Sequence, residues 1–555
     1  MTQEEYLASV QKSQEEAHDE TMWGKPARDI ITGIGNNGGI RPVRAIWELV
    51  QNARDVVCDG KRAKIVFTRN ENSLDFMHDG VPFTHKTIEA LIMQTSSKVS
   101  SNNVQVGQYG TGFLTTHLFG LKFKLTAPLL TSEEYPRYYK ISDFEIDRSA
   151  TDKEVMRGKL KDQWNDTQDW GKDFSQTTEN PFEHTLFSYQ HEGKQARLNA
   201  ESAFKDAPDM VPFVLSINPN IESICFDDRL NDEMVTYVRD SLEMDFVENL
   251  TDGIIYKTKV HRTKNTNVGK DDKDYYIYCI ISNEETDDEP KRSKVIVTLP
   301  ITEDEDGVLR VIRFDNTLPQ VYIYLPLLGT EEWGFNYLLH SSLFTCDKDS
   351  RDSLRLVGNG QNNDDQAEAN RNIIDLADKL ICQFIDKKVT TLRDAKYLCR
   401  ASFKTQQADA KLGEYYNTLQ TFWRNKFESL CIVDGSDSAK HYVRETKVLD
   451  ETLAQACEED LELLDAIYGL FAKVNTWIVP KKEDMVYWSN TINRWYRDEE
   501  KNEHQIAITT LAAAIPALTI VTTDLTWLHK IDKYISDNQD ALLDTYTLIP
   551  NEVLK

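Results

Sequence analysis

The sequence predicts a mixed α+β protein, and three observations support that class. Apolar residues recur at helical spacing over residues 44–57, and residues 73–83 then alternate at strand spacing before a turn. From residue 364 onward the spacing is helical almost throughout. A chain of 555 residues is too long for one core. We therefore expect three domains, at residues 1–222, 223–360 and 361–555.

The composition is that of a soluble globular protein, with 40% hydrophobic and 28% charged residues. The formal net charge of −27 argues against a nucleic-acid partner, because phosphate neutralisation needs clustered cations. The N-terminus lacks the basic and apolar regions of a signal peptide, and the most apolar run, 506–521, is too short to span a bilayer. We expect a cytoplasmic protein with no membrane segment.

Residues 44–57 carry a polar stripe as well as an apolar one. The apolar stripe consists of Ile46, Leu49, Val50, Ala53 and Val57. Glu48, Asn52 and Asp55 follow at steps of four and three, so they share one line of the helix. An amide oxygen suits Mg²⁺, and a carboxylate one turn away can orient or deprotonate water. The alternative is an ordinary solvated face.

Residues 73–83 form a predicted strand that ends in a turn. Asp79 and Gly80 interrupt the alternation, and Pro82 stops it. An acidic residue at the end of a strand can accept a hydrogen bond from the exocyclic amine of a base. Residues 106–119 then hold Gly107, Gly110 and Gly112 at the start of a helical pattern. Such glycines let backbone N–H groups approach a phosphate closely, although turns and helix caps use glycine too.

Taken together and in this order, the three stretches resemble the ATP-binding domain of the GHKL superfamily, which includes gyrase, ninety-kilodalton heat-shock chaperones, histidine kinases and MutL. Glu48, Asn52 and Asp55 match its asparagine box, and Asp79-Gly80 its first glycine box. The second glycine box would be Gly107, Gln108, Tyr109, Gly110, Thr111, Gly112 and Phe113, close to the heat-shock chaperone pattern. The runs 78–83 and 96–98 look more like sacsin-type and related bacterial members.

The resemblance covers roughly residues 1–220 and implies a fold for each part of the chain. It implies a Bergerat-type α/β sandwich that binds ATP in residues 1–222. A transducer-like or middle-like α+β domain would follow in 223–360, and a helical region in 361–555.

The resemblance also implies a role for each motif residue. Asn52 would hold Mg²⁺, Glu48 would align the attacking water, and Asp79 would select adenine. Lys98 would reach the phosphates from a lid, and Thr185 would contact the adenine edge. Arg351 would reach the γ-phosphate from the second domain, with residues 310–313 as a less well placed alternative. These three have ordinary alternatives, which are an exposed lysine, a strand threonine and a loop salt bridge.

One motif departs from the family pattern Asp-x-Gly-x-Gly. If the glycines set the register, His78 falls where the adenine-binding aspartate belongs; if the acid sets it, Asp79 keeps that role. The sequence favours Asp79, because a carboxylate accepts a hydrogen bond from an amine in any orientation, whereas a histidine must present an unprotonated nitrogen.

The expected function is Mg²⁺-dependent binding and slow hydrolysis of ATP, which would drive lid closure and a rearrangement of domains or of a dimer. The resemblance implies protein clients or partner subunits, a nucleotide-dependent homodimer, and a chaperone-like or conflict-associated and defence-associated role. The alternatives are a nucleotide-binding scaffold without hydrolysis and a DNA clamp like MutL or a topoisomerase. Outside the motifs, we expect a helix over 232–244 and an irregular surface insertion over 152–175.

Overall fold

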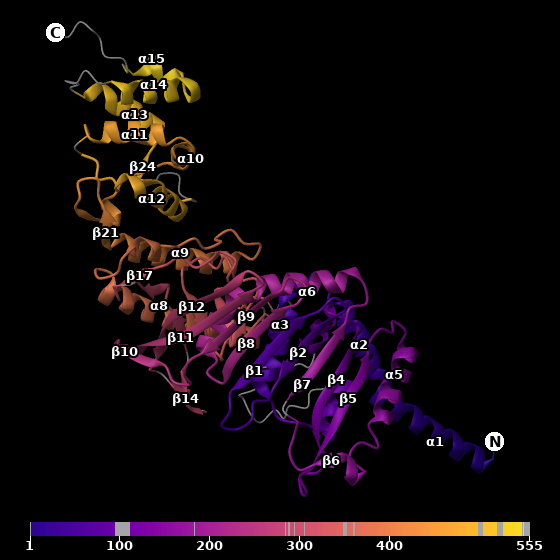
Figure 1. Ribbon diagram of the computed structural model, residues 1–555. Coiled ribbons are helices and arrows are strands. Elements are labelled where there is room, and N and C mark those ends of the chain that lie inside the picture. Colours follow the sequence, from indigo (N-terminus) through magenta and orange to yellow (C-terminus); the bar gives the residue numbers. More distant parts are fainter. Residues whose placement is uncertain are drawn as a thin grey trace, which may run out of the picture. The chain divides into compact units, whose positions relative to one another are not determined.

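In a computed structural model, the chain forms two compact units (Figure 1). The structure describes residues 2–94, 112–182, 184–283, 285–286, 289–293, 295–304, 306–347, 352–358, 361–474, 476–497, 503–518, 525–546 and 548. The first unit consists of Met1–Leu299, Val321–Gly329 and Leu338–Ser353. The second consists of Pro300–Gln320, Thr330–Tyr337 and Leu354–Lys555.

The first unit is built on one large mixed sheet. Its strands follow the order β19 (Leu325–Pro326), β18 (Val321–Ile323), β20 (Leu338–His340), β15 (Ile296–Thr298), β12 (Gly269–Ser282), β11 (Gly253–Thr266), β9 (Glu233–Arg239), β8 (Ile221–Asp228), β1 (Ala63–Arg69), β2 (Ser73–His78), β7 (Thr185–Gln190), β4 (Lys122–Leu130), β5 (Tyr138–Asp147) and β6 (Thr177–Thr178). β10 (Asp245–Asn249) pairs with β11, and β3 (Phe83–Thr84) pairs with β4. The pair β1 and β8 is parallel, whereas β1 and β2 are antiparallel.

Helices of the first unit come mainly from its N-terminal half. They are α1 (Gln3–Asp19), the π-helix η1 (Glu20–Gly24), α2 (Lys25–Gly35), α3 (Val43–Asp55), α4 (His85–Met93), the 3₁₀ helix η2 (Gly112–Leu118), α5 (Lys153–Asp166), η3 (Phe174–Gln176), α6 (Lys194–Asp206), η4 (Pro208–Met210) and α7 (Val211–Ile217). A separate hairpin joins β13 (Glu285–Thr286) to β14 (Glu289–Ser293).

The core of the first unit lies between α3 and one face of the sheet. On α3, the predicted apolar residues Ile46, Leu49, Val50 and Ala53 are fully buried. Alternate residues of β2 and β7 are buried as well, which is the period expected of strands with one covered face. Phenylalanine rings carry this face from strand to strand, with centroids 5.2 to 5.8 Å apart along Phe67, Phe76, Phe187 and Phe123. The helix stripe predicted over residues 44–57 is confirmed, although the helix ends at Asp55.

The second unit is mainly helical. Its elements are β16 (Ile301–Glu303), β17 (Leu309–Val311), α8 (Gln361–Lys388), η5 (Ala395–Leu398), α9 (Ala410–Glu428), β21 (Cys431–Asp434), β22 (Lys440–Tyr442), η6 (Val443–Glu445), β23 (Val448–Leu449), α10 (Glu451–Glu459), α11 (Leu461–Phe471), α12 (Lys482–Trp495), β24 (Gln505–Ile506), α13 (Ile508–Ala514), η7 (Ile515–Ala517), α14 (Thr526–Asn538) and α15 (Ala541–Thr545). Trp423, Trp488 and Trp495 are buried in its core.

Two expectations about local structure are wrong. Residues 152–175 are not an irregular insertion, because α5 begins there with Asp152 as a cap that accepts hydrogen bonds from the N–H groups of Glu154 and Val155. Residues 232–244 do not form a helix. They contain β9, in which buried and less buried residues alternate and which pairs with β8 and β11.

The chain is therefore a mixed α/β protein with a large mixed sheet. The prediction that it combines helices and strands is confirmed to that extent. The three-domain division at residues 222 and 360 stays a prediction. None of the described helices is long and apolar enough to cross a membrane.

Candidate active site

Glu48, Asn52 and Asp55 occur on α3 in three different environments. The Glu48 side chain is 21% exposed and lies near Arg44, with 3.8 Å between Oε1 and Nε. Asn52 is half-buried, and its carboxamide has no hydrogen-bond partner among the residues that the structure describes. The Asp55 side chain is only 3% exposed, and its Oδ1 lies 3.3 Å from Nη1 of Arg54. The stripe thus offers a partly exposed carboxylate, an uncommitted amide and a buried carboxylate in an ion pair.

Glu48 lies directly against Gly112, the last glycine of the third motif stretch. A Cβ atom at Gly112 would stand 2.1 Å from Oε2 of Glu48 and 2.7 Å from its Cδ. Only a residue without a side chain leaves room for the carboxylate in this position. The segment that follows is the short 3₁₀ helix η2, in place of the longer helix that the spacing predicted.

The C-terminal end of α3 meets the second motif stretch. A Cβ atom at Gly80 would stand 2.7 Å from the main-chain oxygen of Val56, the residue that caps α3. The N–H of Val81 donates to the same oxygen at 2.8 Å. The turn after β2 is thus packed onto the end of the helix.

Asn52 lies between these two contacts. Glu48, Asn52 and Val56 are four residues apart, so the α-carbons of Glu48 and Val56 are about 12 Å apart along the axis, with that of Asn52 midway. One helix therefore brings residues from all three motif stretches into a single region of the first unit.

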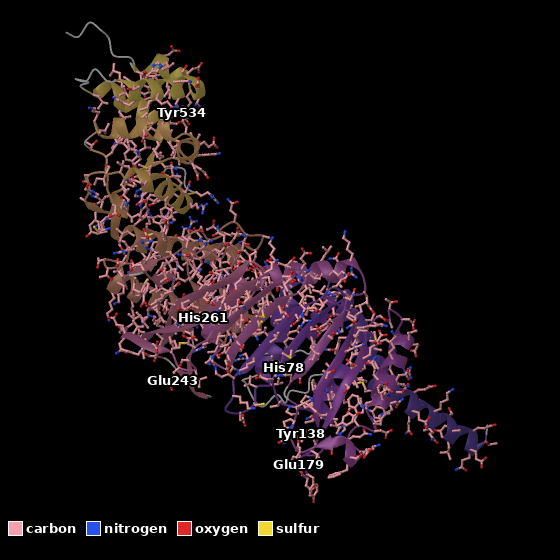
Figure 2. All side chains as sticks on the ribbon, in the orientation of Figure 1. His78, Tyr138, Glu179, Glu243, His261 and Tyr534 are labelled. Carbon is pink, nitrogen blue, oxygen red and sulfur yellow. The ribbon has the colours of Figure 1, made fainter. Side chains whose placement is uncertain are left out.

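His78 and Asp79 at the end of β2 point to different surroundings. His78, labelled in Figure 2, is 6% exposed and pairs across the sheet with Thr185. Its Nδ1 accepts a hydrogen bond from the N–H of Gly80 at 3.1 Å, and burial lowers its pKa to about 4. The imidazole is therefore neutral at pH 7 with its proton on Nε2. Asp79 is half-exposed, and its Oδ1 accepts from the N–H of Lys64 at 2.8 Å.

Thr185 is the most enclosed of the predicted site residues. It is 1% exposed, and its hydroxyl has no hydrogen-bond partner in the described part of the chain. A buried hydroxyl without a partner carries a desolvation cost, which a bound water or ligand atom would relieve. Because Thr185 lies opposite His78, that free hydroxyl belongs to the same end of the region as Gly80.

Phe113 has a packing role. Its ring lies 5.9 Å from that of Phe123 and 6.1 Å from that of Phe187, within the aromatic layer of the core. The neighbouring His117 is buried too, which lowers its pKa to about 3. Anchoring of Phe113 and His117 in the core holds the backbone of Gly112 against Glu48.

Seven predicted site residues lie outside the described residues. They are Lys98, Gly107, Gln108, Tyr109, Gly110, Thr111 and Arg351. Their assignments stay predictions.

Arg44 was not predicted to belong to the site. It lies one helical turn before Glu48 and also contacts Asp352, with 2.5 Å between Nη1 and Oδ1. The four-residue spacing of Arg44 and Glu48 is visible in the sequence, since such pairs meet on a helix. The partner Asp352 is 308 residues away and has no local signal.

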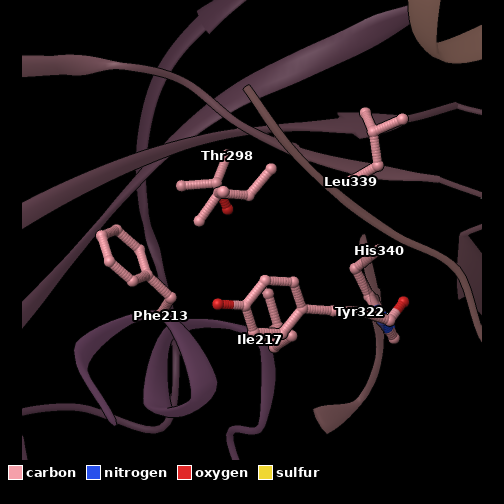
Figure 3. Close-up of a pocket in the computed structure, with 7 residues that line it drawn as sticks. Phe213, Ile217, Thr298, Tyr322, Leu339 and His340 are labelled. Carbon is pink, nitrogen blue, oxygen red and sulfur yellow. The ribbon is translucent and has the colours of Figure 1, made fainter. Parts of the chain in front are cut away.

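A pocket elsewhere in the first unit is a packing seam (Figure 3). It is lined by Phe213, Ile217, Thr298, Tyr322, Leu338, Leu339 and His340, and it has no room for a water molecule. Burial lowers the pKa of His340 to about 4, so this histidine is neutral at pH 7. We assign no ligand to this pocket.

Comparison with known proteins adds no identification. No protein family and no curated protein matches the sequence.

Proposed function

We propose that the protein binds ATP together with Mg²⁺ and hydrolyses it slowly. The observation that carries the proposal is the convergence of three motif stretches on α3. Glu48 lies against Gly112, the cap residue Val56 lies against Gly80, and Asn52 stands between them. Three stretches that are separate in the sequence thus meet along one helix, and this order would suit binding of the phosphates, the metal and the base of one nucleotide.

The proposal includes the fold of each part. Residues 1–222 would form a Bergerat-type ATP-binding domain, 223–360 a transducer-like or middle-like domain, and 361–555 a helical region. Support comes from the mixed sheet with helices such as α3 packed on one face, and from the helices α8 to α15 of the second unit.

The donor groups fit a magnesium nucleotide. The uncommitted carboxamide of Asn52 offers the oxygen that Mg²⁺ prefers. The described residues contain no group of three or more His, Cys, Asp or Glu that could hold a metal. A single amide ligand is consistent with that, because protein-bound Mg²⁺ commonly keeps waters and shares substrate phosphates. Asp55, in its ion pair, would support Asn52 from one turn away.

At the phosphate end, Glu48 would act on water. ATP and Mg²⁺, when bound, would supply the phosphoryl group and the charge that neutralises it. Glu48 would orient the attacking water and accept its proton, a role suited to a partly exposed carboxylate. Gly112 would let the main chain approach the phosphates, together with the predicted contacts of Gly107, Gly110 and Lys98.

At the other end, the base would lie near Gly80. The free hydroxyl of Thr185 and the side chains of His78 and Asp79 offer hydrogen bonds there. Asp79 has one carboxylate oxygen bonded to Lys64, which leaves the second oxygen to accept from an adenine amine.

The output of hydrolysis would be a conformational switch in the cytoplasm. Lid closure and contact of Arg351 with the γ-phosphate would couple ATP to a domain rearrangement or to a homodimer that acts on protein clients or partner subunits. A nucleotide-binding scaffold would share the site and differ only in turnover. A DNA clamp is disfavoured by the net charge of −27.

The test combines calorimetry of ATP binding, with and without Mg²⁺, and steady-state hydrolysis. Glu48→Ala should keep ATP affinity and lower hydrolysis by roughly 10² to 10⁴, because a general base acts in the transition state. Asn52→Ala should remove the Mg²⁺-dependent part of the affinity. Gln51→Ala is the control, since Gln51 lies on the same helix but off the stripe.

Absence of ATP binding by the unmodified protein would refute the proposal. Binding without any hydrolysis would leave the scaffold function. Equal loss of affinity in the Glu48 and Asn52 variants would assign Glu48 a structural role.

A further inference from the structure

Arg44 lies between two carboxylates that come from distant parts of the first unit. Its Nη1 is 2.5 Å from Oδ1 of Asp352, and its Nε is 3.8 Å from Oε1 of Glu48. A guanidinium has five N–H donors in a planar fork, so one group can serve both acceptors. The shorter distance shows that Arg44 is committed more strongly to Asp352.

Glu48 and Asp352 each also pack against a glycine, Glu48 through its carboxylate and Asp352 through its main chain and Cβ. Gly112 lies against Glu48, as described above. Gly329 lies against Asp352, since a Cβ there would stand 2.8 Å from the main-chain oxygen of Asp352 and 3.2 Å from its Cβ. Gly329 has a φ of +105°, a conformation that other residues rarely adopt. The contacts thus run without interruption from Gly112 through Arg44 to Gly329.

We propose that Asp352 is a positioning residue for ATP hydrolysis. Asp352 would fix the guanidinium of Arg44, and Arg44 would fix the carboxylate of Glu48 against Gly112. This inference rests on the proposed function, in which Glu48 acts on the attacking water. Asp352 itself would touch neither the nucleotide nor that water.

Arg44 needs Asp352 to hold it in place because its side chain is long and has several rotatable bonds. While Asp352 holds one edge of the guanidinium, the other edge remains at 3.8 Å from Glu48. Without Asp352, Arg44 would move to its remaining carboxylate and form a direct ion pair with Glu48. That pair would draw Glu48 away from Gly112 and from the position in which it orients water.

A surface salt bridge is the ordinary alternative. The Asp352 side chain is 49% exposed, and exposed ion pairs contribute little to folding. Stability therefore separates the two interpretations poorly. The rate of hydrolysis separates them well, because a surface salt bridge has no influence on turnover.

The experiment uses the full chain with Asp352→Asn, Arg44→Gln and the double variant. Turnover at saturating ATP and Mg²⁺, ATP affinity by calorimetry and thermal stability are measured for each. We expect each single variant to lose about tenfold in kcat, as a misplaced reacting group does. ATP affinity should stay within about twofold, because Glu48 contributes little to ground-state binding. Asp352→Glu, which keeps the carboxylate, should recover most of the rate.

The double variant decides whether Asp352 acts through Arg44. If it does, the double variant is no slower than Arg44→Gln alone. The control is the pair formed by Arg229 and Asp227, 3.1 Å apart in the same unit and also on the surface. Arg229→Gln and Asp227→Asn should leave kcat unchanged.

Two results would overturn the inference while leaving the proposed function intact. One is wild-type turnover in Asp352→Asn, and the other is multiplication of the two single losses in the double variant. In either case Glu48→Ala would still lower hydrolysis by roughly 10² to 10⁴. A protein that binds no ATP would refute the proposed function itself, and the role of Asp352 with it.

Discussion

Gly112 shows how one missing side chain controls the position of a functional group. The oxygens of Glu48 fill the space where a Cβ of residue 112 would be. Gly112→Ala must therefore move the carboxylate, which is the end of a flexible side chain and can rotate away at small cost to the fold. We expect hydrolysis to fall by roughly ten to a hundredfold, since a displacement of about 1 Å has effects of that size.

The measurement is kcat beside thermal stability. Gly158→Ala is the matched control, because an added Cβ at Gly158 meets nothing within 4 Å. Normal turnover in Gly112→Ala would mean that the Glu48 carboxylate has no fixed position during hydrolysis.

The end of β2 provides the second prediction at this scale. His78 shares the buried face with Thr185, and its Nε2–H can donate to a ring nitrogen of a purine. One carboxylate oxygen of Asp79 already accepts a hydrogen bond from the N–H of Lys64. We expect His78→Ala to weaken ATP binding more than Asp79→Asn does, measured by calorimetry on both variants. The opposite ranking would show that the proposed contact of Asp79 with adenine contributes more to the affinity than that of His78.

Some residue roles could be predicted from the sequence, and others could not. The stripe of Glu48, Asn52 and Asp55 was predictable, because helical spacing alone brings these side chains onto one line. The contact between Arg44 and Asp352 was not, because it joins residues 308 apart. The environment of His78 likewise depends on cross-strand pairing with Thr185, which no local pattern encodes.

At the scale of elements, α4 is held by an arginine from another segment. Arg148, which follows β5, is 2% exposed and donates to the carbonyl oxygens of Leu91 and Ile92 at 3.2 and 2.6 Å. Burial lowers its pKa to about 10, so the guanidinium stays charged at pH 7. It therefore satisfies carbonyls at the C-terminal end of the helix that no intrahelical donor reaches.

Replacement of this arginine should destabilise the first unit. Arg148→Met removes the donor that the carbonyls of Leu91 and Ile92 share, and we expect a loss of about 2 to 4 kcal/mol in the free energy of unfolding. Amide exchange should rise first in α4. Arg229→Met, at a 63% exposed side chain, should stay within about 0.5 kcal/mol of the wild type. A similar effect from both variants would show that Arg148 is not a cap.

The wrong element predictions have physical causes. Charged residues dominate 152–175, yet Met156, Leu160 and Gln163 are buried, and the cap at Asp152 starts α5. The charged composition of this segment gives no sign that these three side chains are buried. Over 232–244, buried Val235, Tyr237 and Arg239 alternate, and pairing with β8 and β11 makes the segment a strand. Tertiary pairing overrides weak local preference in such segments.

At the scale of the whole molecule, the buried titratable groups give the two units opposite dependence on pH. In the first unit, burial lowers the pKa of His78, His117 and His340 to about 4, about 3 and about 4. In the second, burial raises the pKa of Asp532 to about 6 and that of Asp378 well above its ordinary value. Exposed aspartates in ion pairs also have lowered pKa values, but solvent screens these ion pairs, so they contribute little to the stability of either unit.

Proton linkage gives the direction in which the stability of each unit changes with pH. A histidine with a depressed pKa binds fewer protons when folded, so its stabilisation is present above pH 6.5 and is lost as the pH falls through about 4. Each of the three is worth on the order of 3 kcal/mol over that window. An aspartate with a raised pKa binds more protons when folded. Its stabilisation is complete below pH 3.8 and is lost as the pH rises through the folded value.

We therefore predict that acidification from pH 7 to pH 5 destabilises the first unit and stabilises the second. Amide exchange of the full chain, corrected for intrinsic rates, would follow β1 and β2 for the first unit and α8 for the second. Asp378→Asn is the matched control. It keeps the side-chain shape but cannot ionise, so it should flatten most of the response of α8 while leaving that of β2 unchanged. Parallel loss of protection in both units at pH 5 would contradict the prediction, because it would mean that protonation of Asp378 does not stabilise the second unit.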